Sequence, residues 1–145
     1  LELMLAEFPG LDGKVTLLDG QSRQAMTASN AVLVNSGTAT LEAMLLRKPM
    51  VMSYRVGKIT YGIVSRLVTT EWFALPNILA GRGIVPEFIQ DAAVPSVMAG
   101  ALRRLLDEKE ANDVMATFDE IHQLLKKSVD PGAEAAKAVL GLCEN

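Results

Sequence analysis

Cysteine and histidine are nearly absent from this chain, which has one residue of each among its 145. The lone Cys143 has no partner for an intramolecular disulfide, so a disulfide framework is excluded and a reducing compartment is expected. The lone His122 lies in a predicted helix whose neighbouring acidic residues are typical of a solvated face. We interpret His122 as a structural residue, and a histidine-rich metal site is excluded.

Long apolar runs and net positive charge are also lacking. No apolar run approaches the ~18 residues that indicate a membrane span. The formal net charge is −3, whereas a nucleic-acid-binding surface is normally basic, so no nucleic-acid partner is expected. Aromatic residues make up only 5% of the chain, but half of all residues are hydrophobic. A chain of this length forms about one domain and buries roughly 68–70% of its unfolded surface.

Short apolar runs alternate with helical patterns in the first part of the chain. The runs predict strands at residues 14–18, 31–34, 49–54 and 72–75. Nearly continuous apolar runs are typical of strands that are buried on both faces of a parallel sheet. Helices are predicted between them at residues 21–28, 38–47 and 58–68. This alternation predicts an α/β fold with a Rossmann-like parallel sheet flanked by helices.

Past residue 75 the pattern predicts helices only. A stretch punctuated by proline and glycine leads into a short helix that ends near residue 90, with Glu87 and Gln90 at its start. An acid is expected there because of the helix dipole alone. Three amphipathic helices then follow at residues 96–107, 111–127 and 133–142.

The most informative stretch joins the second predicted strand to the helix after it. Residues 31–34 run directly into Ser36-Gly37-Thr38, and a helix begins at once. This places free backbone N–H groups and the positive end of a helix dipole at the carboxyl edge of the sheet, where phosphates bind. Glu42 lies one turn into that helix, and helical side chains lean toward the helix N-terminus. The stretch predicts amides for a diphosphate and Glu42 for ribose hydroxyls. The alternatives are that Ser36 is only an N-cap and that Glu42 only complements the dipole.

Polar residues also follow the other predicted strands. Ligands of an open parallel sheet bind beyond the carboxyl ends of its strands. Residues 19–22 follow the first strand, Arg55 follows the third, and Asn77, Gly81 and Arg82 follow the fourth. Either arginine can balance the charge of a diphosphate. The simpler alternatives are solvated surface arginines and a turn-forming asparagine.

Several of these elements stand in the order and spacing of a known family. The chain resembles the bacterial lipid-A-disaccharide synthases in Leu-Leu-Asp-Gly at 17–20, Ser-Gly-Thr-Ala-Thr-Leu-Glu-Ala at 36–43, Pro-Met-Val at 49–51, Tyr54-Arg55, and Leu-Pro-Asn-Ile-Leu-Ala-Gly-Arg at 75–82. The last run is specific to that family, whereas Ser-Gly-Thr…Glu is shared with other two-domain glycosyltransferases. Two residues depart from the family pattern: Asn30 replaces the usual aspartate, and Asn35 replaces a small residue.

The resemblance implies one half of a GT-B glycosyltransferase. Residues 1–93 would form its Rossmann-like nucleotide-sugar-binding domain, and residues 94–145 would be C-terminal helices that pack on it or on the N-terminal domain. The chain begins at Leu1 within a predicted helix at residues 1–8, so we expect it to be a piece of a longer protein; the alternative is a complete small protein with a processed start. The resemblance implies that the piece is the C-terminal part. The catalytic residues are expected in the other half, and the fragment alone is expected to be inactive.

The resemblance also implies an activity. Such an enzyme transfers 2,3-diacylglucosamine from UDP-2,3-diacylglucosamine to 2,3-diacylglucosamine 1-phosphate in lipid A biosynthesis. No metal or other cofactor is expected. The family acts in the cytoplasm of Gram-negative bacteria, peripherally on the inner face of the cytoplasmic membrane, and a homodimer is left open.

Substrate-binding residues follow from the same resemblance. The Ser-Gly-Thr turn would hold the diphosphate and Glu42 the ribose, while Arg55 and Asn77 would line the donor cleft beside the loop that contains Gly81 and Arg82. In chain order the set is Ser36, Gly37, Thr38, Glu42, Arg55, Asn77, Gly81 and Arg82. Two other classes stay open: another UDP-sugar enzyme of the same fold, such as an epimerase or a peptidoglycan glycosyltransferase, and a non-catalytic Rossmann-like binding module.

Overall fold

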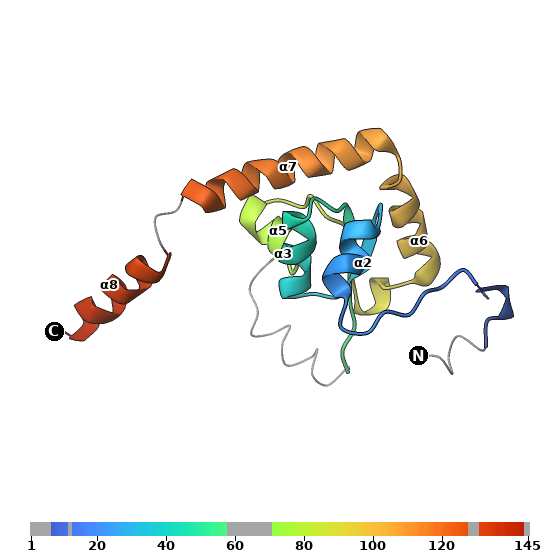
Figure 1. Cartoon of the computed structure of the whole chain (residues 1–145), viewed down its shortest axis with the longest axis horizontal. Helices are drawn as coiled ribbons and strands as arrows, with labels where there is room; N and C mark the ends of the chain where they lie inside the picture. Colours follow the sequence, from blue (N-terminus) through green and yellow to red (C-terminus); the bar gives the residue numbers. More distant parts are fainter. Residues whose placement is uncertain (1–6, 12, 58–70, 128–130, 144–145) are drawn as a thin grey trace.

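A computed structural model describes residues 7–11, 13–57, 71–127 and 131–143 (Figure 1). The helix predicted at residues 58–68 and most of the predicted helix that contains Leu1, residues 1–8, lie outside the described residues. The elements in chain order are η1 (Pro9–Leu11), α2 (Ser22–Ala28), β1 (Val32–Val34), α3 (Thr38–Leu45), β2 (Met50–Tyr54), α5 (Leu75–Ala80), β3 (Glu87–Ile89), η2 (Gln90–Ala92), α6 (Pro95–Arg104), α7 (Glu108–Lys127) and α8 (Pro131–Cys143).

The described strands form one parallel sheet in the order β1-β2-β3. Val32 of β1 pairs with Met50 of β2, and Met52 of β2 pairs with Glu87 of β3. Parallel neighbours need crossover connections, and α3 supplies the one between β1 and β2. The predicted α/β class with a parallel sheet flanked by helices is therefore confirmed, as are the strands predicted at residues 31–34 and 49–54.

Two of the four predicted strands are wrong. Residues 14–18 form no strand, and their apolar side chains are exposed, with Leu18 at 49%. A short apolar segment that pairs with no neighbouring strand lacks the hydrogen bonds and side-chain packing that stabilise an extended conformation. Residues 72–75 are also irregular, because Leu75 already begins α5 with Pro76 at the first helical positions. Proline is favoured there because its fixed φ suits a helix start and its missing N–H has no intrahelical role.

The short helix predicted to end near residue 90 is wrong. Glu87–Ile89 instead form β3, the third strand of the sheet. Glu87 pairs along β2, and the 3-10 turn η2 begins only at Gln90. The run Glu-Phe-Ile is short and contains an acid, so its sequence pattern carries little strand signal. Its position is fixed by contacts to distant backbone groups, described below.

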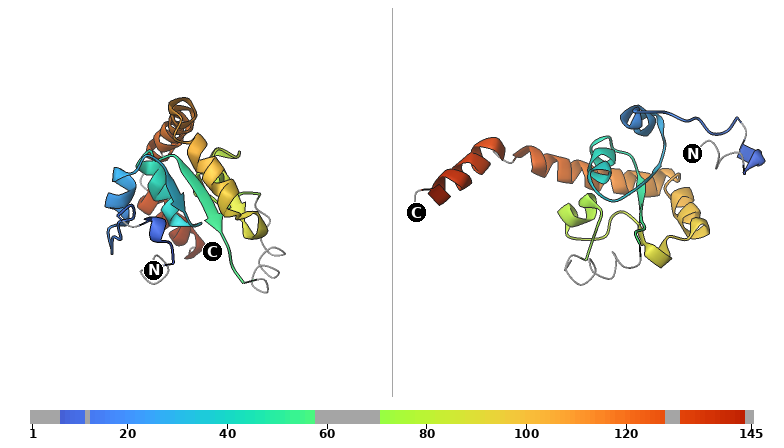
Figure 2. Two further views of the ribbon diagram at one scale, coloured as in Figure 1. Left: turned by 90° about the vertical axis from the view of Figure 1, so that its right-hand side faces the viewer. Right: turned by 90° about the horizontal axis from the view of Figure 1, so that it is seen from below.

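Alternate residues of β2 serve two cores, one on each face of the sheet. Met50 and Met52 pack in the cluster that includes Met44 of α3 and Phe118 of α7. Val51 points the other way and packs with Ala101 and Leu105 beside α6. Figure 2 shows this arrangement end-on, with α2 and α3 on one side of the sheet, α6 on the other and α7 across one end.

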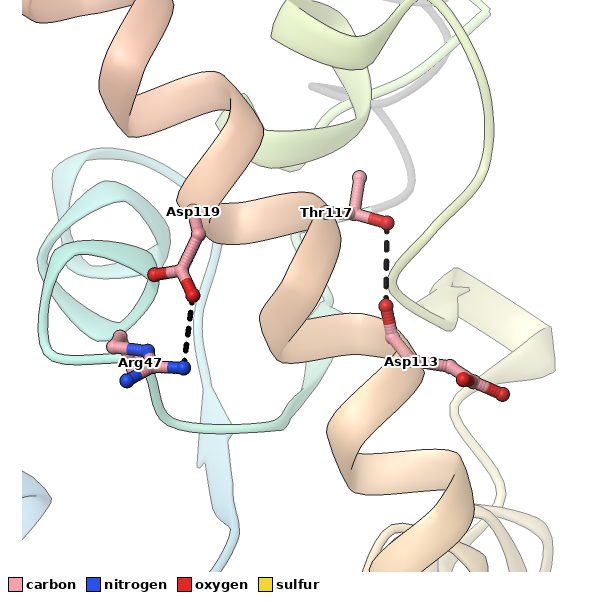
Figure 3. Close-up of polar contacts among 4 residues, drawn as sticks. All are labelled: Arg47, Asp113, Thr117 and Asp119. Atoms are coloured by element: carbon pink, nitrogen blue, oxygen red, sulfur yellow. Dashed lines mark hydrogen bonds and ion pairs between the residues drawn. The ribbon is translucent and has the colours of Figure 1, made fainter.

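The long helix α7 ties the two sides together. Asp107 precedes the helix and caps its N-terminus, since its carboxylate accepts hydrogen bonds from the N–H groups of Lys109 and Glu110. Further along, Asp119 forms a 2.8 Å ion pair with Arg47, which follows α3 (Figure 3). Helices α6 and α7 pack on the elements of the sheet layer, and the predicted division into residues 1–93 and 94–145 stays a prediction.

Helix α8 lies beyond the end of α7 and away from the sheet in Figures 1 and 2. Val139 and Leu140 on it are 61% and 63% exposed. No helix in the described part of the chain combines the length and apolar character needed to cross a membrane.

Candidate functional site

The turn before α3 has the geometry of an anion-binding loop. Gly37 is the N-cap residue, with φ 101° and ψ −155°, a conformation that is open to glycine and strained for other residues. The Gly37 carbonyl accepts hydrogen bonds from both the backbone N–H and the hydroxyl of Thr40, at 3.1 and 2.7 Å. Within the part of the chain that the structure describes, the N–H groups of Thr38 and Ala39 have no hydrogen-bond acceptor. These two amides are therefore available to an anion.

Asn35 contacts the same turn. Its side-chain Oδ1 accepts a 2.9 Å hydrogen bond from the backbone N–H of Ser36. The Ser36 amide is thus occupied in this structure. The free amides of the turn are therefore those of Thr38 and Ala39, at the first two positions of α3.

The structure brings Thr38 and Glu42 together in one pocket. An open cavity of about 370 Å³ lies along α3, from its first residue to its C-cap, and is lined by Arg23, Thr38, Leu41, Glu42, Leu45 and Leu46. Glu42 is half-buried there, one turn from the amides of the N-terminus. Of the residues predicted for the nucleotide, Thr38 and Glu42 line this cavity, whereas Ser36 and Gly37 do not, and the roles predicted for all four stay predictions.

Arg23 of α2 is a pocket residue that sequence reasoning missed. It is exposed and adds a positive charge to a cavity that already contains a helix N-terminus. The sequence did point to the preceding residues, 19–22, as a polar segment at the carboxyl edge. Arg23 follows this segment directly, so its positive charge next to the carboxyl edge was the signal that could have identified it as a pocket residue.

Asn77 has a wholly internal set of partners. Its side chain is fully buried, and Oδ1 accepts hydrogen bonds from the N–H groups of Ile84 and Val85, each at 2.8 Å. Nδ2 donates to the Val85 carbonyl at 2.8 Å and to Glu87 Oε1 at 2.7 Å. These four bonds use the donors and acceptors of the amide. The structure thus gives Asn77 a structural role, and contact with a donor sugar would require this loop to rearrange.

The side chains of Glu87 and Gln90 bond backbone groups of distant segments. The prediction that these two residues start an α-helix is wrong. The Glu87 carboxylate accepts hydrogen bonds from the N–H groups of Phe73 and Ala74 at 2.9 Å each, besides the one from Asn77. The Gln90 side chain bonds both the N–H and the carbonyl of Val56, at 2.8 and 3.0 Å. Glu87 fixes the entry to α5, and Gln90 fixes the segment that follows Arg55.

The other three predicted site residues, Arg55, Gly81 and Arg82, lie in different parts of the structure. Arg55 is exposed directly after β2 and so lies at the same edge of the sheet as the turn after β1. Gly81 ends α5 in the left-handed conformation. Arg82 reaches away from the turn, with Nη2 3.5 Å from Thr117 Oγ1 on α7. Arg55 therefore lies at the same edge of the sheet as the turn before α3, whereas the side chain of Arg82 reaches toward α7.

Among the residues that the structure describes, no group of three or more histidine, cysteine, aspartate or glutamate side chains is placed to hold a metal ion. The expectation of a metal-free reaction stays a prediction.

The fold and the pocket define a class: a parallel α/β domain with a glycine turn, free amides and a carboxylate at the carboxyl edge of its sheet, where nucleotides bind in such domains. The family model described as lipid-A-disaccharide synthetase matches residues 4–139. The chain belongs to this family.

Several curated relatives, all called lipid-A-disaccharide synthase, match most of the chain. The protein of Pseudomonas aeruginosa is 52% identical over 130 residues, which are 90% of this chain and 33% of the relative. That of Pseudomonas putida is 47% identical over 145 residues, which are 100% and 37%. That of Azotobacter vinelandii is 47% identical over 133 residues, which are 92% and 34%. The chain thus spans about a third of the length of the relatives it matches.

Proposed function

We propose that this chain is the donor-binding part of a lipid-A-disaccharide synthase and binds the UDP portion of UDP-2,3-diacylglucosamine. The observation that supports the proposal most is the pocket in which the amide-bearing turn and Glu42 meet, in a chain of this family. The parent enzyme would transfer the diacylglucosamine unit to 2,3-diacylglucosamine 1-phosphate. Membership of the family argues against the epimerase and peptidoglycan alternatives.

The pocket can stabilise a departing diphosphate. The acceptor hydroxyl oxygen forms a bond to the anomeric carbon of the donor while the bond from that carbon to the diphosphate breaks. The electron pair leaves with UDP, and the hydroxyl proton passes to a base outside the eight residues predicted here. The amides of Thr38 and Ala39 and the dipole of α3 face the negative charge that develops, with Arg23 or Arg55 as counter-charge. Glu42 would hold the ribose hydroxyls, and no metal is needed in this scheme.

Location and assembly belong to the same proposal. The substrates carry acyl chains, so the parent enzyme would act in the cytoplasm at the inner face of the cytoplasmic membrane, bound peripherally. A homodimer stays a prediction. Transfer by this chain alone is not expected, because the acceptor site and the base would come from the rest of the enzyme.

Titration of the chain with UDP by isothermal titration calorimetry tests the proposal. We expect weak binding of UDP, weaker binding of UMP because it lacks the second phosphate, and further loss with Glu42→Ala. Glu120→Ala, at an exposed acid on α7, is the matched control and should bind UDP as the unchanged chain does. Absence of UDP binding by a chain with a folded circular-dichroism spectrum would contradict the proposal and leave the non-catalytic binding module.

A further inference from the structure

Thr40 is the only threonine among the described residues whose side chain is fully buried, and its hydroxyl joins two segments of the chain. The hydroxyl donates to the Gly37 carbonyl at 2.7 Å. It also accepts a 3.1 Å hydrogen bond from the backbone N–H of Leu75, the first residue of α5. One buried oxygen thus connects the turn before α3 to the start of a helix 35 residues away.

The bond to Gly37 sets the direction of an amide that faces the ligand. The carbonyl of Gly37 and the N–H of Thr38 belong to the same peptide group, which is trans. In a trans peptide these two groups point in opposite directions. Because Thr40 holds the carbonyl toward the helix, the Thr38 N–H is directed outward. Glycine has broad conformational freedom, and the hydroxyl adds a second, shorter hydrogen bond to the carbonyl that the backbone N–H of Thr40 also holds.

The bond from Leu75 fixes the other side of the hydroxyl. The N–H at the start of a helix has no intrahelical acceptor. The carboxylate of Glu87 satisfies the two preceding N–H groups, those of Phe73 and Ala74, and Thr40 satisfies the third. A displacement of α5 would therefore pull on the hydroxyl that orients the Gly37 peptide.

We propose that Thr40 is a positioning residue for the donor diphosphate: its hydroxyl orients the Gly37–Thr38 peptide toward the ligand and couples that orientation to α5. The proposal rests on the proposed function, because the diphosphate is the ligand that the turn would bind. Thr40 acts through the Thr38 amide and makes no contact with the ligand itself.

Three variants of the 145-residue chain test this with UDP as the probe. Thr40→Val keeps the volume of the side chain and removes the hydroxyl, whereas Thr40→Ser keeps the hydroxyl. Ala101→Gly destabilises the cluster on the opposite face of the sheet and controls for a loss of stability alone. Calorimetry gives the Kd for UDP, and thermal melting gives the Tm of each variant.

We expect Thr40→Val to weaken UDP binding by roughly tenfold, since about 1.4 kcal/mol corresponds to a factor of ten. Thr40→Ser should bind within about a factor of two of the unchanged chain, a difference well under 1.4 kcal/mol. Ala101→Gly should lower the Tm and leave the Kd unchanged. Equal Kd values for Thr40→Val and the unchanged chain would overturn the inference, and so would a Thr40→Ser variant that binds as poorly as Thr40→Val.

Hydrogen exchange on the unchanged chain gives a second test that does not require the valine variant to fold. Saturation with UDP should slow exchange of the Leu75 amide, while the amides of α6 keep their rates. If UDP binds but exchange of the Leu75 amide does not slow, the coupling through Thr40 is refuted while the proposed function stands. A chain that binds no UDP at all would instead contradict the proposed function, so the two failures are distinguishable.

Discussion

Glu87 Oε1 accepts a 2.7 Å hydrogen bond from Asn77 Nδ2, and this pair ties β3 to α5. The other hydrogen bonds of both side chains are to backbone groups. Over residues 73–87 these side-chain bonds satisfy backbone N–H groups that have no partner in a regular strand or helix. These two side chains thus hold the segment between α5 and β3 in place through hydrogen bonds within the protein.

Asn77→Ala should destabilise the chain strongly. It would remove the side-chain partner of the N–H groups of Ile84 and Val85 and of the Val85 carbonyl, and the Glu87 carboxylate would lose one of its hydrogen bonds. The expected loss is about 3 kcal/mol, because each unsatisfied buried group costs roughly 1–3 kcal/mol and relaxation recovers part of it. Urea unfolding measures it. Asn112→Ala, at an exposed asparagine of α7, should change stability by less than about 0.5 kcal/mol; equal effects of the two substitutions would disprove the clamp.

Glu87→Gln should also destabilise, since one side-chain oxygen becomes an NH₂ group facing the N–H of Phe73 or Ala74. The expected cost is about 1–3 kcal/mol for the lost charge-assisted bond. Glu120→Gln, an exposed acid on α7, is the isosteric control and should be neutral. If urea midpoints were the same for both variants, the Glu87 carboxylate would not be holding the entry to α5.

Gly37→Ala tests the backbone of the turn. An added Cβ would meet nothing within 4 Å, so the cost would come only from the positive φ of 101°. We expect a loss of about 1–3 kcal/mol in stability and weaker UDP binding. Gly100→Ala in α6 also has open space around its Cβ, but it lies in a helix and should be neutral or stabilise by roughly 0.4–1 kcal/mol. The same change in unfolding midpoint at both positions would argue against a strained Gly37.

Arg55→Ala should weaken UDP binding, and the loss should fade at high salt because exposed charges are screened beyond a Debye length of about 10 Å at 0.1 M. Arg103→Ala, an exposed arginine on α6, should leave the affinity unchanged at any salt concentration. Calorimetric titrations at two salt concentrations make the comparison. A loss for Arg55→Ala that does not depend on salt would instead indicate a packing role.

Breaking the Arg47–Asp119 ion pair should matter little (Figure 3). The side chains are 57% and 46% exposed, and such surface pairs contribute under about 1 kcal/mol. A double-mutant cycle of the two alanine substitutions, followed by urea unfolding, should give a small coupling energy that falls as salt is added. A coupling that persists at 1 M salt would mean that the pair is effectively buried.

The part of the fold that local pattern decides was predictable. Continuous apolar runs identified β1 and β2, and the Ser-Gly-Thr turn identified the start of α3 with Glu42 beside its N-terminus. Pro76 also offered a local signal for the start of α5, because proline is favoured at the first position of a helix. Reading residues 72–75 as a strand overlooked that signal.

The rest depends on contacts between distant residues. Nothing near Glu87 in the sequence shows that its carboxylate accepts hydrogen bonds from the backbone 13 and 14 residues earlier, and this contact helps to fix β3. Asn77 has the composition of a loop residue, but its burial is set by the loop that folds over it. Arg23 reaches the pocket only because α2 and α3 lie side by side.

The most direct test of the central claim, that a diphosphate binds at the N-terminus of α3, is a titration of the ¹⁵N-labelled chain with UDP followed by NMR. The account predicts that the amide signals of Thr38 and Ala39 shift most and that those of α6 stay in place. Shifts confined to other parts of the chain, with Thr38 and Ala39 unmoved at saturating UDP, would contradict it.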